Sequence, residues 1–399
     1  MSLSFPSPPV PAQVAHAHEL VRRLGEPLLG GNHADVLADA HAARAALVDT
    51  LIGAREHINL DAALLDVAHP QDGLLNRLVA LCRQGVRVQV LASTPRQAAE
   101  LGPLRRAGAT VRTLERAGGL SGWMEQRFQS MQRQLAVVDG RTAWCGPGSP
   151  STSAGAEGPH LRVRGPIVQR MQHLFLETWK AGEPRLPAPP QHFPPIALSG
   201  RQRMGIAMGA GSTPPASPFG CPLIGAVETA RFSIFIALAR RAPSRRLVQA
   251  IAAAASRSVN VSVLLQHGTL HAWPWRACCA ELMRAGVWLY QADGTKPLPP
   301  HSIVDGVWSS VAIDGASGWH SGDVVDAAQL IVLDPAFASE LDDVCQAAMA
   351  HALLLDAKCL VNPVSFQRWF GGKAVVQTAV TDHAITSVGR SVEGPGLSP

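Results

Sequence analysis

One order of sequence elements occurs twice in this chain, and the repeat limits the folds that the chain can adopt. In each part, segments with helical periodicity alternate with short β-branched runs, and a helix-like segment ends in Arg-Ala-Gly, at 106–108 and again at 284–286. Helices that alternate with short apolar strands are typical of a sheet covered by helices on both faces. The sequence therefore predicts two α/β units in one chain.

A segment dense in proline, glycine and serine separates the two parts. Such a composition breaks both helical and strand periodicity, so we expect it to be a linker. The predicted division of the chain is an N-terminal extension (1–30), a first α/β domain (31–182), the linker (183–218), a second α/β domain (219–370) and a C-terminal tail (371–399).

The composition describes a globular protein. Hydrophobic residues make up 47% of the chain and charged residues only 16%, which excludes wholesale disorder. The net charge of +5 comes almost wholly from arginine, which permits anionic partners, but the arginines are scattered, so a nucleic-acid-binding surface is not expected. Seven cysteines without a Cys-x-x-Cys pair predict neither a disulfide framework nor a thiolate metal site. We expect no metal and no cofactor.

No secretory signal and no unbroken apolar run of about 18 residues is found in the sequence. These features predict a cytoplasmic protein without a transmembrane helix. Attachment to the inner face of the membrane stays open as an alternative.

Each part also contains a strong hairpin signal. Asp139-Gly140 and Asp305-Gly306 both stand between two apolar runs. A two-residue hairpin turn needs positive φ at both central positions, which Asp-Gly tolerates. Taken alone, each aspartate is predicted to be a turn residue.

The order of elements and these hairpins resemble the phospholipase D superfamily and, within it, the bacterial cardiolipin synthases. The segments that carry the resemblance lie between about 31 and 350 and include GVRVQVL at 85–91, LRVRGPIV at 161–168 and VDGVWSS at 304–310. The resemblance implies two phospholipase-D-like α/β/α domains related by a pseudo-two-fold axis, with central mixed sheets covered by helices and a shared cleft between them.

That family carries the signature His-x-Lys-x(4)-Asp on the first hairpin strand of each domain. One histidine attacks phosphorus, the other protonates the leaving alcohol, and the lysines hold the phosphoryl oxygens. In this sequence the two aspartates remain, but Gln132 and Gln134 stand at the first His and Lys positions, and Leu298 and Pro300 at the second. The resemblance implies that the vestigial motif positions line the cleft; they are Gln132, Gln134, Asp139, Ser149, Asp305 and Asp326.

Three functions remain open on these grounds. The first is a catalytically degenerate family member that binds a phosphate-containing or lipid ligand, or an anionic membrane surface. The second is an active phosphatidyltransferase or phosphodiesterase that uses displaced histidines, His301 as nucleophile and His160 as partner; taken by itself, His160 is expected to be an exposed loop histidine. The third is a nucleic-acid-binding or scaffold relative, which rests on arginine usage alone. The oligomeric state is not predicted.

Overall fold

The computed structural model describes residues 17–19, 28–65, 73–92, 94–113, 134–146, 159–180, 193–207, 222–238, 242–271, 273–293, 300–313 and 328–357. The predicted C-terminal tail and most of the predicted N-terminal extension lie outside these ranges.

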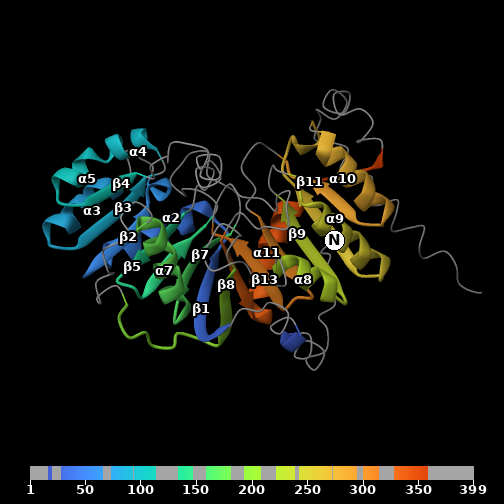
Figure 1. The fold of residues 1–399 in the computed structure, drawn as a ribbon, viewed down its shortest axis with the longest axis horizontal. Coiled ribbons are helices and arrows are strands. Elements are labelled where there is room, and N and C mark those ends of the chain that lie inside the picture. The colour runs from blue at the N-terminus through green and yellow to red at the C-terminus, as the bar shows by residue number, and fades with distance from the viewer. Residues whose placement is uncertain are drawn as a thin grey trace, which may run out of the picture.

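The two parts of the chain repeat one pattern of elements (Figure 1). The first half contains, in chain order, β1 (Leu29–Leu37), α2 (Ala40–Ile52), β2 (His57–Asp61), the 3-10 turn η1 (Ala62–Leu64), α3 (Leu74–Arg83), β3 (Arg87–Ala92), α4 (Pro95–Glu100), α5 (Gly102–Arg106), β4 (Thr110–Thr113), β5 (Leu135–Val138), β6 (Thr142–Cys145), β7 (His160–Arg164) and α7 (Ile167–Lys180). The second half contains β8 (Gln202–Ala207), α8 (Pro222–Thr229), β9 (Ser233–Leu238), α9 (Arg245–Ser256), β10 (Asn260–Leu265), the 3-10 turn η4 (Thr269–His271), α10 (Trp273–Arg284), β11 (Trp288–Gln291), β12 (His301–Val304), β13 (Trp308–Ala312), β14 (Gln329–Leu333), α11 (Pro335–Met349) and β15 (Leu353–Leu354).

The described strands form one mixed sheet of 15 strands, in the order β15-β11-β10-β9-β12-β13-β14-β8-β1-β7-β6-β5-β2-β3-β4. Strands β2, β3 and β4 pair in parallel, as do β9, β10 and β11. The hairpin β5–β6 joins β2 antiparallel, and the hairpin β12–β13 joins β9 in the same way. The order is therefore symmetric about the pair β8–β1. The α/β fold predicted from the sequence is confirmed, and in addition the two halves share one sheet.

Several predicted boundaries follow from local sequence signals. Asp39 accepts a hydrogen bond from Ala42 N and begins α2, and Ser244 caps α9 in the same way through Leu247 N. Gly108 and Gly286, the last residues of the two Arg-Ala-Gly tripeptides, have φ values of 102° and 87°. Glycine adopts this left-handed region without a Cβ clash, so it turns the chain from helix to strand.

The linker prediction needs one correction. Strand β8 lies inside the segment 183–218, where we expected neither helix nor strand. Its six residues carry only Met204 and Ile206 as large apolar side chains, and prolines lie on both sides. The strand is stabilised by partners far along the chain, β1 and β14, which a local pattern does not reveal.

The strand pair β1–β8, which we call the seam, joins the two halves. Two buried side chains, those of Asn32 and Gln202, form hydrogen bonds along it. The backbone register of β1 with β8 is irregular, with Leu29 opposite Met204 and Asn32 opposite Gln202. Asn32, with 0% exposure, accepts from Ile167 N at 2.8 Å and donates to Leu29 O at 2.5 Å. Gln202 Oε1 accepts from Ala34 N at 2.7 Å. These side chains supply hydrogen bonds where the irregular ladder leaves backbone groups without them.

One apolar core is common to both halves. It contains side chains of β5, β7 and α7 from the first half and of β12, β13 and α11 from the second. Two further cores belong to one half each, under α2 and α3 and under α8 and α9. Helices α7 and α11 therefore share one core, and burial of apolar surface joins the halves in addition to the strand pair.

Candidate functional site

The aspartates of the two hairpins form a repeated backbone clasp. Asp139 has φ 52°, and its carboxylate accepts from three backbone N–H groups, those of Arg55 at 2.9 Å, Glu56 at 2.8 Å and His57 at 2.9 Å. The clasp thus holds the first residues of β2 against the turn between β5 and β6. Because backbone N–H groups occupy both oxygens of its carboxylate, Asp139 has a structural role.

The second half repeats this clasp atom for atom. Asp305 also has φ 52°, and it accepts from Arg231 N at 2.9 Å, Phe232 N at 2.8 Å and Ser233 N at 2.9 Å. Asp305 is 2% exposed, whereas the donors around Asp139 include exposed ones. Both aspartates are the turn residues that the Asp-Gly signal predicts.

The lysine positions of the two motifs meet at one place. Gln134 N donates to Ile313 O at 3.3 Å, and Pro300 O accepts from Ala312 N at 3.0 Å. Residues from the first half and the second half thus contact two consecutive residues at the end of β13. We call Gln134, Pro300, Ala312 and Ile313 the motif junction.

Gln134 is the polar side chain of this junction. It is 4% exposed, and its Oε1 has no hydrogen-bond partner among the described residues. A buried amide oxygen without a donor costs free energy, and a ligand hydroxyl, a ligand amine or a water molecule would satisfy it. Gln132, Ser149 and Asp326 lie outside the described residues, and their place in a cleft stays a prediction, as does that of the whole set.

A carboxylate that the sequence did not single out lies next to the junction. Asp61, at the end of β2, is 4% exposed, and its Oδ2 accepts from Leu135 N at 3.0 Å. It therefore lies beside the residue that follows Gln134. The signal was present in the sequence, because His57, Asn59 and Asp61 alternate with Ile58 and Leu60 along one strand.

The same face of β2 forms a buried polar layer with α7. His57, Asn59 and Gln172 all have 0% exposure, and both amide atoms of Asn59 lack a hydrogen-bond partner within the described ranges. Burial lowers the pKa of His57 below its ordinary value, although the charge of Asp139 acts in the opposite direction. His57 is therefore a neutral imidazole at pH 7.

His301 and His160 both lie in the core. His301 is 2% exposed, its Nε2 lies 3.3 Å from Cys345 Sγ, and its ring lies 5.7 Å from that of Phe235. Burial raises the pKa of Cys345, so its thiol stays protonated at neutral pH.

The expectation that His160 is an exposed loop residue is wrong. It begins β7 and is 1% exposed, with its ring 5.9 Å from that of Trp144. A Cβ at position 146 would collide with the imidazole, so only glycine fits beside it. The cause is the pairing of β7 with β1, which covers His160 with Leu37.

The described residues hold no group of three or more His, Cys, Asp or Glu side chains that would bind a metal ion. Over the same ranges, the structure has no helix that is long and apolar enough to cross a membrane.

Two solved structures have a fold similar to that of this chain. The fold resembles the crystal structure of phosphatidylserine synthase from Haemophilus influenzae Rd KW20, with a TM-score of 0.59 and 11% identity over 93% of this chain and 98% of that one. It also resembles polyphosphate kinase from Porphyromonas gingivalis, with a TM-score of 0.51 and 11% identity over 89% of this chain and 53% of that one. These likenesses show that the chain shares its overall fold with both structures.

The amino-acid sequence is similar to those of cardiolipin synthases. The chain is 26% identical over 372 residues to cardiolipin synthase A of Cronobacter sakazakii and of Salmonella newport, which covers 87% of this chain and 75% of each relative. No family model matches the sequence. The relatives support the description of this chain as a cardiolipin-synthase-like protein of the phospholipase D superfamily.

Proposed function

We propose that this protein is a catalytically degenerate cardiolipin-synthase-like protein that binds a phosphate-containing or lipid ligand at the motif junction. The observation that carries the proposal is the junction itself, where Gln134 and Pro300 stand in place of the two lysines. Neither an amide nor a proline carries the positive charge with which the lysines of the motif hold the phosphoryl oxygens. Gln132 and Leu298, at the histidine positions, have no lone pair that attacks phosphorus near pH 7. The junction retains a buried acceptor, Gln134 Oε1, and a neighbouring carboxylate, Asp61.

The names of the relatives suggest the class of ligand. Cardiolipin synthases and a phosphatidylserine synthase are named for phospholipid products, so we propose a phospholipid or its headgroup as the ligand, met at the membrane surface. We also propose that the domain boundaries predicted from the sequence hold, with β8 assigned to the second half.

The alternative, an active enzyme with displaced histidines, is less well supported. A nucleophilic His301 must reach a phosphorus atom, yet its Nε2 contacts the Cys345 thiol inside the shared core. His160 is packed against Trp144 and the backbone at Gly146. Both imidazoles would have to leave these places before they met a substrate.

The test mixes purified protein with phosphatidylglycerol vesicles and follows cardiolipin and free glycerol over hours. We expect no product from the unmodified chain, but sedimentation with these vesicles at low salt and not with phosphatidylcholine vesicles. The variant Gln134→Lys places a cation at the junction and is expected to tighten vesicle binding. Turnover by the unmodified protein that is lost in His301→Ala would overturn the proposal in favour of the alternative.

A further inference from the structure

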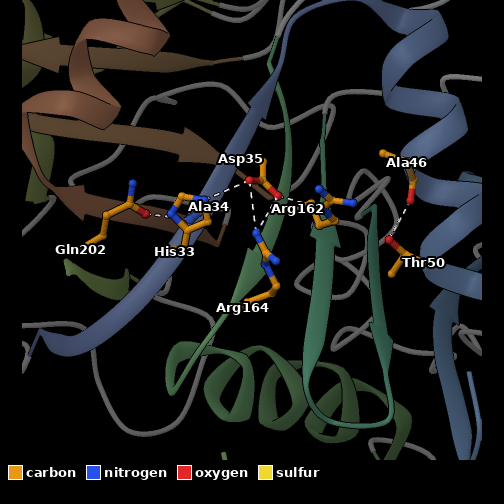
Figure 2. A network of polar contacts seen from close by, with 8 residues as sticks. All are labelled: His33, Ala34, Asp35, Ala46, Thr50, Arg162, Arg164 and Gln202. Atoms are coloured by element: carbon orange, nitrogen blue, oxygen red, sulfur yellow. Dashed lines mark hydrogen bonds and ion pairs between the residues drawn. The ribbon is translucent and has the colours of Figure 1, made fainter. Parts of the chain in front are cut away.

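A polar network lies across β1 and β7, beside the seam and apart from the motif junction (Figure 2). The strand register puts His33 opposite Arg164 and Asp35 opposite Arg162. Asp35 receives all three: His33 Nε2 lies 3.0 Å from Oδ1, Arg162 Nε lies 2.8 Å from Oδ2, and Arg164 Nη2 lies 3.3 Å from both oxygens. One carboxylate thus serves three basic side chains.

The network has a surplus of positive charge and of hydrogen-bond donors. Two guanidinium groups, always charged, face one carboxylate, and protonation of His33 adds a further charge. Among the described residues, Arg162 bonds Asp35 through Nε only and Arg164 through one Nη only, while Arg164 Nε is buried without a hydrogen-bond partner. A single carboxylate cannot fill two guanidinium forks, so donors remain for a second anion.

The exposure of these side chains suits a binding site. The exposed side-chain fractions are 39% for His33, 33% for Arg162, 43% for Arg164 and 23% for Asp35. The groups are reachable from solvent and yet partly desolvated, which strengthens their electrostatic interactions.

The site is separate from the motif junction. The register of β5, β6 and β7 puts Leu135, the neighbour of Gln134, level with Leu161. Arg164 stands three residues further along β7, which is about 10 Å at the usual rise of a strand. The Arg164 side chain lies on one face of the sheet, and the side chains of Ala34 and Val163 lie on the other face, where they belong to the shared core.

We propose that Arg162, Arg164 and His33 form a second anion site, which takes a phosphoryl group, and that Asp35 is an internal counter-ion competing for the same guanidinium groups. Forked N–H donors match the oxygens of a phosphate, which accept in pairs. The phosphoryl group has two sources, a soluble phosphate or an anionic lipid headgroup, and the experiment separates them. The inference does not depend on the function proposed for the junction.

The charge state of Asp35 supports the competition. Burial alone would raise its pKa, but the hydrogen bond from Arg162 and the charges of Arg162, Arg164 and His33 outweigh burial and lower it. Asp35 is therefore a carboxylate at neutral pH and occupies the guanidinium groups in the free protein. It follows that removal of this acid should strengthen phosphate binding, although most losses of an ion pair weaken a site.

The experiment compares three variants of the full chain with the parent. Asp35→Asn keeps the shape and removes the charge; we expect inorganic phosphate to bind about three- to tenfold more tightly, as one unit charge at contact distance allows in a water-rich site. Arg164→Gln should lose most of the binding. Arg96→Gln, which removes an arginine that is 90% exposed and paired with Glu100 on α4, is the matched control and should leave binding unchanged.

Two probes are used, inorganic phosphate by calorimetry and phosphatidylglycerol vesicles by sedimentation against phosphatidylcholine vesicles. We expect Asp35→Asn to bind most tightly, the parent less tightly and Arg164→Gln least. This order with inorganic phosphate assigns a soluble ligand, and the same order with vesicles alone assigns a lipid headgroup. Either result supports the site. If Asp35→Asn binds both probes no better than the parent, the proposal is wrong. In case Asp35→Asn does not fold, the ¹⁵Nε signal of Arg164 is followed in the parent, and a signal that phosphate leaves unchanged also overturns it.

Discussion

The clasp aspartates offer a quantitative test, because the same geometry occurs at two degrees of burial. Replacement of Asp305 by alanine leaves three backbone N–H groups without their acceptor, those of Arg231, Phe232 and Ser233. A buried donor left unsatisfied costs about 1–3 kcal/mol, and water reaches part of this group, since the donors are only partly buried. Alanine at φ 52° adds about 1 kcal/mol. We therefore expect Asp305→Ala to lower the free energy of unfolding by about 3–5 kcal/mol.

The matched change in the first half should cost less. Asp139→Ala removes the same set of bonds, but the amides of Arg55 and Glu56 are in exposed surroundings, where water replaces the carboxylate. We expect a loss of about 1–2 kcal/mol. Asp305→Gly relieves the positive φ and separates the backbone contribution from the loss of the carboxylate.

Urea denaturation of the variants measures the difference, and hydrogen exchange followed by mass spectrometry on the peptide that contains 231–233 locates it. Exchange of these amides should accelerate in Asp305→Ala. If Asp305→Ala and Asp139→Ala unfold at the same urea concentration as the parent, the aspartates do not clasp the strands, and the assignment of these motif residues to a structural role is refuted.

Three further predictions follow from the described contacts. Asn32→Leu removes the acceptor of Ile167 N and the donor to Leu29 O at a site with 0% exposure, and should lower the free energy of unfolding by about 2–4 kcal/mol in urea denaturation; a loss under about 0.5 kcal/mol would contradict the stitching role. Because burial raises the pKa of Cys345, its thiol should be inert to Ellman's reagent at pH 8 until urea unfolds the chain, whereas the half-buried Cys82 and Cys278 are open to reaction; fast labelling of Cys345 itself in the native protein, located by mass spectrometry, would show that the core opens. His57 has a lowered pKa in the folded state, so its contribution to stability is complete above the unfolded value of about 6.5 and is lost as the pH falls below it; His57→Gln should flatten this part of the stability profile, and an unchanged slope would exclude His57 as its source.

Local patterns in the sequence predicted most of the fold. Both Asp-Gly pairs form the predicted turns, because turn chemistry is a property of adjacent residues. Strand β8 was missed since its stability depends on β1 and β14, which lie far away along the chain. The continuity of the sheet through β8 and β1 has the same non-local origin.

The candidate site was less predictable. Counting from the aspartates assigned Gln134 and Pro300 to motif positions, but it did not reveal that both contact the end of β13. The partner of His301, Cys345, is 44 residues away on a helix, and no spacing rule connects the two. Asn32 follows two glycines, and nothing in this local pattern indicates that it is buried by the convergence of three segments. Contacts between elements, rather than patterns within them, decide such roles.

The pair β1–β8 also determines what either half would do alone. In the described strand order the outer strands are short, β15 with two residues and β4 with four, so the described sheet offers little backbone for pairing with another molecule. A first half cut from the second would expose β1, nine residues long, along one side. Because the halves share a fold, two copies of that fragment could pair through the unpaired strand β1 and form a dimer, or further copies could associate and aggregate. The fusion of two similar units into one chain thus removes the sheet edge most open to aggregation.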